Sequence, residues 1–374
     1  MLVKDTLLYV FKAVIFGLIM AVAILLLSPS SGKGFSFSHL FNQNNESNQL
    51  SFSQAVRKAA PSVVNIYTIN IIPARKLDSK SLQNRSELQG LGSGVIMNAD
   101  GYILTNYHLV KQADEIVIDL QDGRRFDAEV IGTDPETDLA VIKINGQNLP
   151  VVPLNLNVLP NVGDVVLAIG NPYNIGQTIT QGIISATGRN SLSSGYQEFL
   201  QTDAAINEGN SGGALINTNG VLIGINTAAF QVGGESGKGI NFAIPTKLAY
   251  NIMEKLIKSG RVIRGAIGFN GESLSSKPKY ARVLGLKSLS GVIATDIEPD
   301  SPAFHAQLRR GDVIVKYQEE VIPTGRAGIW MLRDRIAETK PGTQAVLSII
   351  RRGLAMDLTI KVTEKKAPVD IALQ

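Results

Sequence analysis

The sequence contains no cysteine among its 374 residues. Disulfide frameworks, thiolate zinc sites, iron–sulfur clusters and cysteine nucleophiles are therefore excluded. Histidine is nearly as scarce, because only His39, His108 and His305 are present. Any chemistry that depends on an imidazole must use one of these three positions. The length predicts two or three domains, and a content of 44% hydrophobic against 18% charged residues argues against disorder over most of the chain.

A strong charge imbalance is also missing, since the net charge is +4. The basic surplus lies in the C-terminal part, where residues 261–366 hold 18 Lys and Arg against 11 Asp and Glu. No clustered basic helix and no basic strand with interleaved aromatic residues accompanies this surplus. We therefore expect no nucleic-acid partner.

The N-terminal segment is apolar from residue 7 to residue 27, except at Lys12. A helix over this stretch would span ~31 Å, which matches the core of a bilayer. Lys4 and Lys12 precede the unbroken run of residues 13–27, so the positive-inside rule puts the N-terminus in the cytoplasm and the rest of the chain outside it. A cleaved signal peptide is the alternative. We predict a retained single-pass anchor over residues 1–28 and a flexible linker, rich in Ser and Asn, over residues 29–52.

The middle of the chain has the pattern of a β-rich domain. Short apolar runs rich in β-branched residues alternate with turn signals, including Asp-Gly and Asn-Gly pairs at residues 100–101, 122–123 and 219–220. About a dozen short strands predict a sandwich or a pair of barrels. An apolar stripe that starts at Leu248 predicts a helix that stops at Gly260. We therefore expect one domain over residues 53–260.

Three residues with the chemistry of acyl transfer stand at the ends of predicted strands. His108 lies in LTNYHLV, Asp138 in PETDLAVIKI and Ser211 in EGNSGGAL. Acyl transfer needs a nucleophile, a base within hydrogen-bond reach and a carboxylate that fixes the imidazole tautomer. Each residue alone is more often structural. Together, in the order His, Asp, Ser, they predict a catalytic triad.

The glycines around Ser211 have a physical purpose of their own. A strained loop that presents backbone N–H groups to a developing oxyanion needs residues without a Cβ. We expect the N–H groups of Gly209 and Ser211 to form this oxyanion hole. We also expect Gly212 and Gly213 to let the substrate backbone approach the nucleophile.

The motifs TNYHLV, TDLAV and GNSGGAL, together with residues 164–189, resemble those of the HtrA family of trypsin-fold serine proteases. The resemblance covers residues 52–366. It implies a mainly β fold with a trypsin-like double six-stranded β-barrel, and an enzyme that needs neither a cofactor nor a metal. It also implies that His108 is the general base and acid, Asp138 its orienter and Ser211 the nucleophile.

The same resemblance implies roles for three further residues. In the trypsin fold, the residue six before the nucleophile forms the base of the S1 pocket, which here is Ala205 with Ile206 beside it. No carboxylate is present there to bind Lys or Arg, so we expect cleavage after small apolar residues such as Val or Ala. Arg189 falls in the loop that these proteases use to pass activation to the oxyanion hole.

Residues 261–366 resemble a PDZ domain, on the motifs RGAIGF and SPAFHAQL and on a Gly-Asp pair followed by an apolar strand. PDZ domains bind C-terminal peptides as an added strand, and a nest of backbone N–H groups holds the terminal carboxylate. The matching loop consists of Gly265, Ala266, Ile267, Gly268 and Phe269. Residues 367–374 then form a C-terminal tail.

An anchor followed by one protease domain and one PDZ domain resembles the regulatory, inner-membrane members of this family. The resemblance implies a homotrimer whose folded domains lie in the periplasm. Its substrate would be an RseA-like anti-sigma factor, and its activators would be C-termini of misfolded outer-membrane porins that bind the PDZ domain and trigger the envelope stress response. Two alternatives stay open: a general periplasmic quality-control protease of the same family, and a non-catalytic scaffold that binds C-termini.

Overall fold

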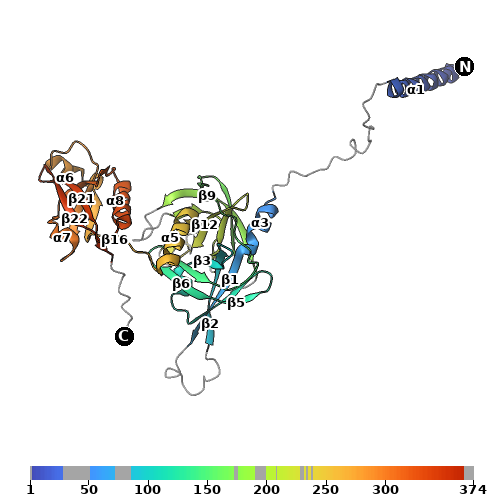
Figure 1. Cartoon of the computed structure of the whole chain (residues 1–374). Helices are drawn as coiled ribbons and strands as arrows, with labels where there is room; N and C mark the ends of the chain where they lie inside the picture. The colour runs from blue at the N-terminus through green and yellow to red at the C-terminus, as the bar shows by residue number, and fades with distance from the viewer. Residues whose placement is uncertain are drawn as a thin grey trace. The chain divides into compact units, whose positions relative to one another are not determined.

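The structure is a computed structural model of the whole chain. It divides into two units, residues 1–51 and 52–374 (Figure 1). The residues that it describes are 2–27, 51–71, 86–171, 176–189, 199–207, 209–227, 231–232, 235–236 and 239–365. His39, nearly all of the predicted linker and the predicted C-terminal tail lie outside these residues.

The first unit contains helix α1, Leu2–Leu27. Its side chains are described from Leu8 to Ala23, and those of residues 8–22 are exposed. Within the described part of the chain, no helix combines the length and the apolar character that a membrane crossing requires. The single-pass anchor therefore stays a prediction.

The second unit begins with a short helix, α3 (Ser53–Ala59), and a 3-10 turn, η1 (Ala60–Ser62). A seven-stranded sheet follows, with the strand order β5-β4-β1-β2-β3-β7-β6. A one-turn helix, α4 (Tyr107–Val110), follows β3. The strands are β1 (Val63–Ile71), β2 (Ser86–Ile96), β3 (Tyr102–Thr105), β4 (Glu115–Asp119), β5 (Arg125–Asp127), β6 (Glu129–Asp134) and β7 (Leu139–Lys143).

The two edge strands of this sheet, β5 and β6, follow each other directly in the sequence. Strand β5 pairs with β4 at one edge and β6 pairs with β7 at the other, and only Ala128 separates β5 from β6. The Ala128 N–H donates to the Ile116 carbonyl and so continues the pairing of β5 with β4 by one residue. The family resemblance implied six strands here, and the structure divides this half into seven strands because β5 and β6 are separated at Ala128.

The other half of the protease region is a closed barrel of six strands, in the order β10-β15-β12-β11-β8-β9. A separate hairpin pairs β13 (Gln231–Val232) with β14 (Glu235–Ser236). The barrel strands are β8 (Val165–Gly170), β9 (Thr178–Arg189), β10 (Phe199–Thr202), β11 (Ala214–Asn217), β12 (Leu222–Thr227) and β15 (Asn241–Pro245).

Helix α5, Thr246–Ser259, packs against β6 and β7 of the first sheet and against β12 of the barrel (Figure 1). It buries a stripe of apolar side chains that includes Ile252 and Leu256, and it ends at Gly260 in the left-handed conformation with φ of 70°. Glycine is the residue that adopts this conformation at least cost. The helix that the sequence predicted is thus confirmed, and it closes a core shared by both sheets.

An ion-pair cluster joins the end of β6 to the start of the C-terminal region. The Arg264 guanidinium donates to both carboxylate oxygens of Asp134, at 2.8 and 2.6 Å, and both residues are buried. Beside this pair, Lys365 lies 2.7 Å from Glu136. A bidentate pair of this kind fixes the geometry of both partners.

The C-terminal region contains a five-stranded path, β17-β18-β19-β21-β22, with β20 paired to β19. Strand β17 is an edge strand, and helix α8 packs beside it and beside β16, which pairs with β23. The elements are β16 (Gly265–Ala266), β17 (Phe269–Ser273), η4 (Leu274–Ser276), α6 (Pro278–Val283), β18 (Val292–Ile297), α7 (Pro302–His305), β19 (Val313–Tyr317), β20 (Glu320–Val321), α8 (Arg326–Glu338), β21 (Gln344–Arg351), β22 (Leu354–Lys361) and β23 (Thr363–Glu364).

Candidate active site

Strand pairing brings His108 and Asp138 together. His108 lies on α4, just after β3, and Asp138 immediately precedes β7, which pairs with β3. His108 Nδ1 lies 2.8 Å from Asp138 Oδ2, and the backbone N–H of His108 donates to Asp138 Oδ1 at 3.0 Å. One carboxylate therefore holds both the imidazole ring and the backbone of the turn that carries it.

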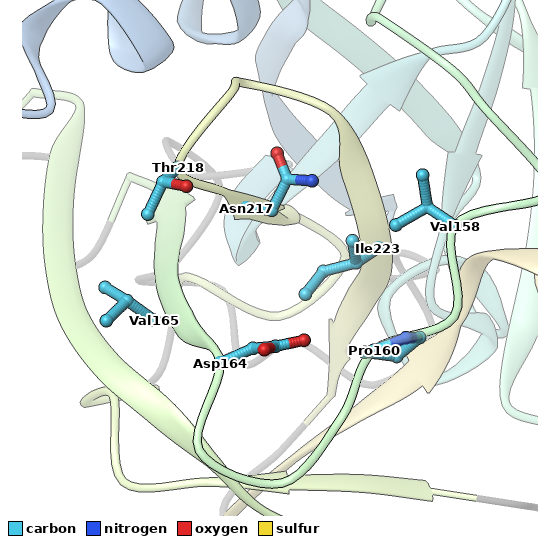
Figure 2. Close-up of a pocket in the computed structure, with 7 residues that line it drawn as sticks. All are labelled: Val158, Pro160, Asp164, Val165, Asn217, Thr218 and Ile223. Atoms are coloured by element: carbon cyan, nitrogen blue, oxygen red, sulfur yellow. The ribbon is translucent and has the colours of Figure 1, made fainter.

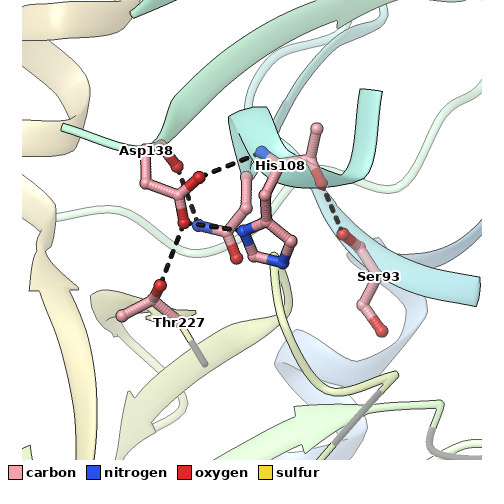
Figure 3. A network of polar contacts seen from close by, with 6 residues as sticks. Ser93, His108, Asp138 and Thr227 are labelled. Carbon is pink, nitrogen blue, oxygen red and sulfur yellow. Dashed lines mark hydrogen bonds and ion pairs between the residues drawn. The ribbon is translucent and has the colours of Figure 1, made fainter. Parts of the chain in front are cut away.

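Asp138 is itself held from both halves of the protease region. Its carbonyl accepts hydrogen bonds from the backbone N–H of Tyr107 at 3.1 Å and from Asn106 Nδ2 at 2.9 Å. Its carboxylate accepts a third hydrogen bond, at 3.1 Å, from the hydroxyl of Thr227 on β12 (Figure 3). The backbone of Asp138 is left-handed, with φ of 54°, a conformation that Asp tolerates better than most residues.

Ser211 lies in a loop between the two halves and is only 5% exposed. Three N–H groups of this loop already have an acceptor, because those of Asn210, Gly212 and Gly213 donate to backbone carbonyls of the protein. Among the described residues, the N–H groups of Gly209 and Ser211 have no acceptor, and these are the two donors that the sequence predicted for an oxyanion hole.

The three predicted triad residues lie in one region of the structure, although only His108 and Asp138 are hydrogen-bonded to each other. A Cβ added to Gly212 would meet the hydroxyl of Thr105, which ends β3 three residues before His108. This contact puts the nucleophile loop at the end of the strand that leads to the imidazole. Over the described part of the chain, no hydrogen bond joins the Ser211 hydroxyl to His108. Catalytic hydrogen bonds are often long before substrate binds.

Ser93 contacts the loop of Ser211, and the sequence analysis missed it. It lies on β2, is fully buried, and makes four hydrogen bonds. Its hydroxyl donates to the Gly209 carbonyl at 2.7 Å and accepts from the Asn171 N–H at 3.0 Å, and its N–H donates to the Ser211 carbonyl at 2.9 Å. The fourth bond comes from the Thr105 hydroxyl, at 2.8 Å. The only signal in the sequence was a serine between two glycines inside a strand.

Gly212 and Gly213 serve a purpose different from the one that the sequence suggested. A Cβ on Gly212, whose φ is +79°, would lie 2.1 Å from the Ser93 carbonyl, and one on Gly213 would lie 2.2 Å from the Ile169 carbonyl. The space beside both residues is therefore filled by the protein's own backbone. The expectation that they admit the substrate backbone is wrong, because these glycines let the nucleophile loop pack between the two sheets.

The two predicted S1 residues differ in exposure. Ala205 is exposed, and its carbonyl accepts a hydrogen bond from the Thr180 hydroxyl at 2.7 Å. Ile206 is 2% exposed and packs inside the core of the six-stranded barrel. Arg189 ends β9 opposite Phe199, and its side chain lies outside the described residues.

The predicted carboxylate-binding loop connects β16 to β17. The Ile267 carbonyl accepts a hydrogen bond from the Ala303 N–H. The Gly268 carbonyl accepts two, from the Glu298 N–H and from the Ser301 hydroxyl. In the described structure, the N–H groups of Ile267 and Gly268 have no acceptor. His305 lies on the nearby α7, exposed and edge-on to Phe304.

A pocket with a volume of about 220 Å³ lies at the far end of the barrel (Figure 2). Its lining includes Val165 at the start of β8 and Asn217 at the end of β11, whereas the other ends of these strands approach the nucleophile loop. This pocket therefore does not belong to the triad region. The described residues also contain no group of three potential metal ligands.

Two protein families match the chain. A model described as a trypsin-like peptidase domain matches residues 92–225, and one described as a PDZ domain matches residues 265–362. These matches, on a chain in which His108 contacts Asp138 next to a Ser211 loop with two unpaired N–H groups, define a trypsin-like serine endoprotease followed by a PDZ domain.

Relatives narrow this class. The chain is 45% identical to the serine endoprotease DegS of Escherichia coli K12 over 361 residues, which is 96% of this chain and 98% of the relative. It is 45% identical to DegS of Haemophilus influenzae over 320 residues, 84% of this chain and 88% of that protein. The solved structure of the HtrA-type protease AlgW with a tripeptide is 44% identical, with a TM-score of 0.76, and the match covers 85% of this chain and 98% of that one.

A serine endoprotease from Yersinia pestis is also similar in structure, with 46% identity, a TM-score of 0.68 and coverage of 84% of this chain and 98% of that chain. With relatives matched over nearly their whole length, the chain belongs to the HtrA family of serine proteases. It is a DegS-type serine endoprotease, as the resemblance in its motifs implied.

Proposed function

We propose that Ser211, His108 and Asp138 form the catalytic triad. The observation that carries this proposal is the pair of contacts between His108 and one carboxylate, at 2.8 and 3.0 Å, beside a loop with two unpaired N–H groups. Ser211 Oγ attacks the scissile carbonyl while His108 removes its proton, and His108 then gives that proton to the leaving amine. Asp138 stabilises the imidazolium, and the N–H groups of Gly209 and Ser211 bind the oxyanion.

We assign the base of the S1 pocket to Ala205. A small exposed residue at this position, with no carboxylate, favours a small apolar side chain before the scissile bond. Matched peptides with Val or Arg at that position test the assignment, and faster cleavage after Arg would contradict it.

The proposed activity is regulated through the PDZ domain. Support comes from the open edge of β17 beside α8 and from the unpaired N–H groups of Ile267 and Gly268, which suit an added strand that ends in a carboxylate. Gly265, Ala266 and Phe269 complete this loop. Two solved relatives are titled as the HtrA-type protease AlgW with a tripeptide and with a decapeptide, so a relative of this fold binds peptides.

We further propose that the activators are C-termini of misfolded outer-membrane porins and that the substrate is an RseA-like anti-sigma factor. The chain would act as a homotrimer in the periplasm, with Arg189 in the loop that passes activation to the oxyanion hole. Residues 53–260 form the protease domain and residues 261–366 the PDZ domain. The apolar run of residues 13–27 supports an inner-membrane anchor, with residues 29–52 as its linker.

Cleavage of a candidate anti-sigma-factor domain, with and without a porin C-terminal peptide, tests this function. We expect the peptide to accelerate cleavage and Ser211→Ala to abolish it. Degradation of unfolded casein without any peptide would favour a general quality-control protease instead. Complementation of a deletion strain by Ser211→Ala would favour a scaffold that binds C-termini.

A further inference from the structure

Three turns meet at one end of the C-terminal sheet and carry a dense group of cations. They are residues 279–287, which comprise most of α6 and the turn after it, residues 309–312 before β19, and residues 351–354 between β21 and β22. We name them together the basic turn surface. Their cations are Lys279, Arg282, Lys287, Arg309, Arg310, Arg351 and Arg352, and their one carboxylate is Asp312.

Direct contacts join the three turns. The Tyr280 hydroxyl donates to the Gly311 carbonyl at 2.7 Å, which links the first turn to the second. Arg351 donates to both oxygens of the buried Asp312, at 2.8 and 2.6 Å, which links the second turn to the third. A Cβ built on Gly353 would lie 3.3 Å from the Leu284 carbonyl, so the third turn also adjoins the first. The turns therefore form one continuous surface.

Six of the seven cations on this surface are unneutralised. Asp312 is already paired with Arg351. The other six side chains belong to exposed residues, and none of them takes part in an ion pair within the described residues. Such a concentration of uncompensated charge costs electrostatic self-repulsion, which an anionic partner relieves.

Two aliphatic side chains project from the same surface. Val283 is 83% exposed and Leu354 is 69% exposed. Exposed aliphatic residues together with Lys and Arg are typical of protein surfaces that lie in the headgroup region of a bilayer. Nucleic acid is a poorer fit, because the one aromatic residue of the surface, Tyr280, has its hydroxyl bonded to Gly311 and no aromatic face is offered for base stacking.

The surface contains none of the residues of the peptide-binding loop, 265–269. Ile350, just before the turn that ends β21, is opposite Val313, and Val313 is opposite Ile293, which pairs with Glu272 of β17. Strands β18 and β19 lie between β17 and that turn. The basic turn surface and the peptide-binding loop are therefore formed by different residues on different strands.

We propose that the basic turn surface binds the surface of a bilayer that contains anionic lipid. Lys and Arg side chains neutralise lipid phosphates while Val283 and Leu354 enter the interfacial layer. This contact goes beyond the proposed protease function and is made by folded residues, so it does not depend on the apolar N-terminal segment. Each basic residue close to an anionic membrane strengthens binding roughly fivefold.

The absence of cysteine makes a site-specific test possible with the full chain. An environment-sensitive fluorophore is attached to Ala355→Cys, beside Leu354, or to Gln344→Cys at the opposite end of the same β21–β22 hairpin; both positions are exposed. The labelled proteins are mixed with vesicles of phosphatidylcholine alone or of phosphatidylcholine with phosphatidylglycerol. We expect a blue shift at position 355 only with phosphatidylglycerol, and its loss at high salt.

A charge-matched pair of variants identifies the surface. Arg282→Glu/Arg310→Glu and Lys340→Glu/Lys361→Glu change the net charge equally, and Lys340 and Lys361 lie toward the other end of the sheet. We expect the first variant to weaken the lipid-dependent shift at least about 25-fold in apparent affinity, and the second to leave it in place. Equal shifts at the two label positions, equal effects of the two variants, or a response to a short DNA duplex but not to vesicles would each overturn the proposal.

Discussion

The two sides of the active site are held in different ways. On the base side, His108 and Asp138 contact each other directly through their side chains, and both lie next to paired strands of one sheet. On the nucleophile side, the Ser211 loop belongs to the barrel but is held by backbone carbonyls and by Ser93 from the other sheet. The proposed base is therefore positioned mainly by contacts within one sheet, with one hydrogen bond from the barrel through Thr227, whereas the position of the proposed nucleophile depends on how the two halves of the protease region pack.

Replacing Asp138 by Asn gives the largest expected effect on this comparison. The amide cannot stabilise the imidazolium and favours the wrong tautomer, so we expect kcat to fall by about 10⁴-fold. Asn also tolerates the left-handed φ of 54° at this position, so the fold should persist. Steady-state kinetics on a peptide substrate measures the loss, and thermal unfolding checks the fold. A loss smaller than tenfold would show that the base side does not rest on this carboxylate.

Replacing Ser93 by Ala tests the nucleophile side. The change removes the hydroxyl that donates to the Gly209 carbonyl and accepts from the Asn171 N–H, so Gly209, one of the two proposed oxyanion donors, is held less firmly. We expect kcat to fall by roughly 10- to 100-fold with little change in KM, because an oxyanion donor acts in the transition state.

Ser62→Ala is the matched control for Ser93. Ser62 is also a buried serine whose hydroxyl donates to a backbone carbonyl, that of Ala59, at 2.6 Å. Its loss should lower stability by about 1 kcal/mol and leave kcat unchanged. If both variants lower kcat equally, the effect of Ser93 is one of general stability and the contrast between the two sides fails.

Thr227→Val tests how much the position of Asp138 and His108 depends on the hydrogen bond from the barrel. This change removes a hydrogen bond of 3.1 Å to the Asp138 carboxylate, which keeps its two contacts with His108. We expect kcat to fall about tenfold or less, since one hydrogen bond to a charged group is lost. A loss as large as that of Asp138→Asn would show that both sides depend on packing between the two halves.

Replacing Tyr317 by Phe gives the smallest expected effect, which is on stability at alkaline pH. Tyr317 lies on β19, outside the protease region. Burial raises the pKa of the Tyr317 phenol, while its hydrogen bond with Thr339 lowers the pKa in part. Because the pKa is higher when folded, the stability from this group is fully present below pH ~10 and is lost as the pH rises through the folded pKa. Denaturant unfolding between neutral and alkaline pH should show a smaller alkaline loss in the variant. Peptidase activity without activator should not change.

The sequence predicted the parts of the site that local patterns encode. A histidine after one strand and an aspartate before another meet because antiparallel pairing aligns β3 with β7, and the helix up to Gly260 follows from its apolar stripe and its stop residue. The unpaired N–H groups of Gly209 and Ser211 follow from the glycine-rich loop. These features depend on neighbours in sequence or on a single strand pair.

The missed features depend on contacts between distant segments. Ser93 donates a hydrogen bond to Gly209, which lies 116 positions later in the chain, and no local sequence pattern predicts this contact. The purpose of Gly212 and Gly213 was misjudged for the same reason, because the carbonyls that exclude a side chain come from Ser93 and Ile169. The seventh strand arose where one run divides at Ala128 to pair at both edges of its sheet.

The contact of Ser93 with the nucleophile loop also has a consequence for the order of folding. A contact between segments so far apart forms only after the intervening chain has closed, which is a late event in folding. In a folding chain whose barrel has formed, but whose two halves have not yet docked, we therefore expect the loop of Ser211 to lack its contact with Ser93. If the proposed oxyanion donors depend on this contact, the protease gains activity only once its two halves have packed together.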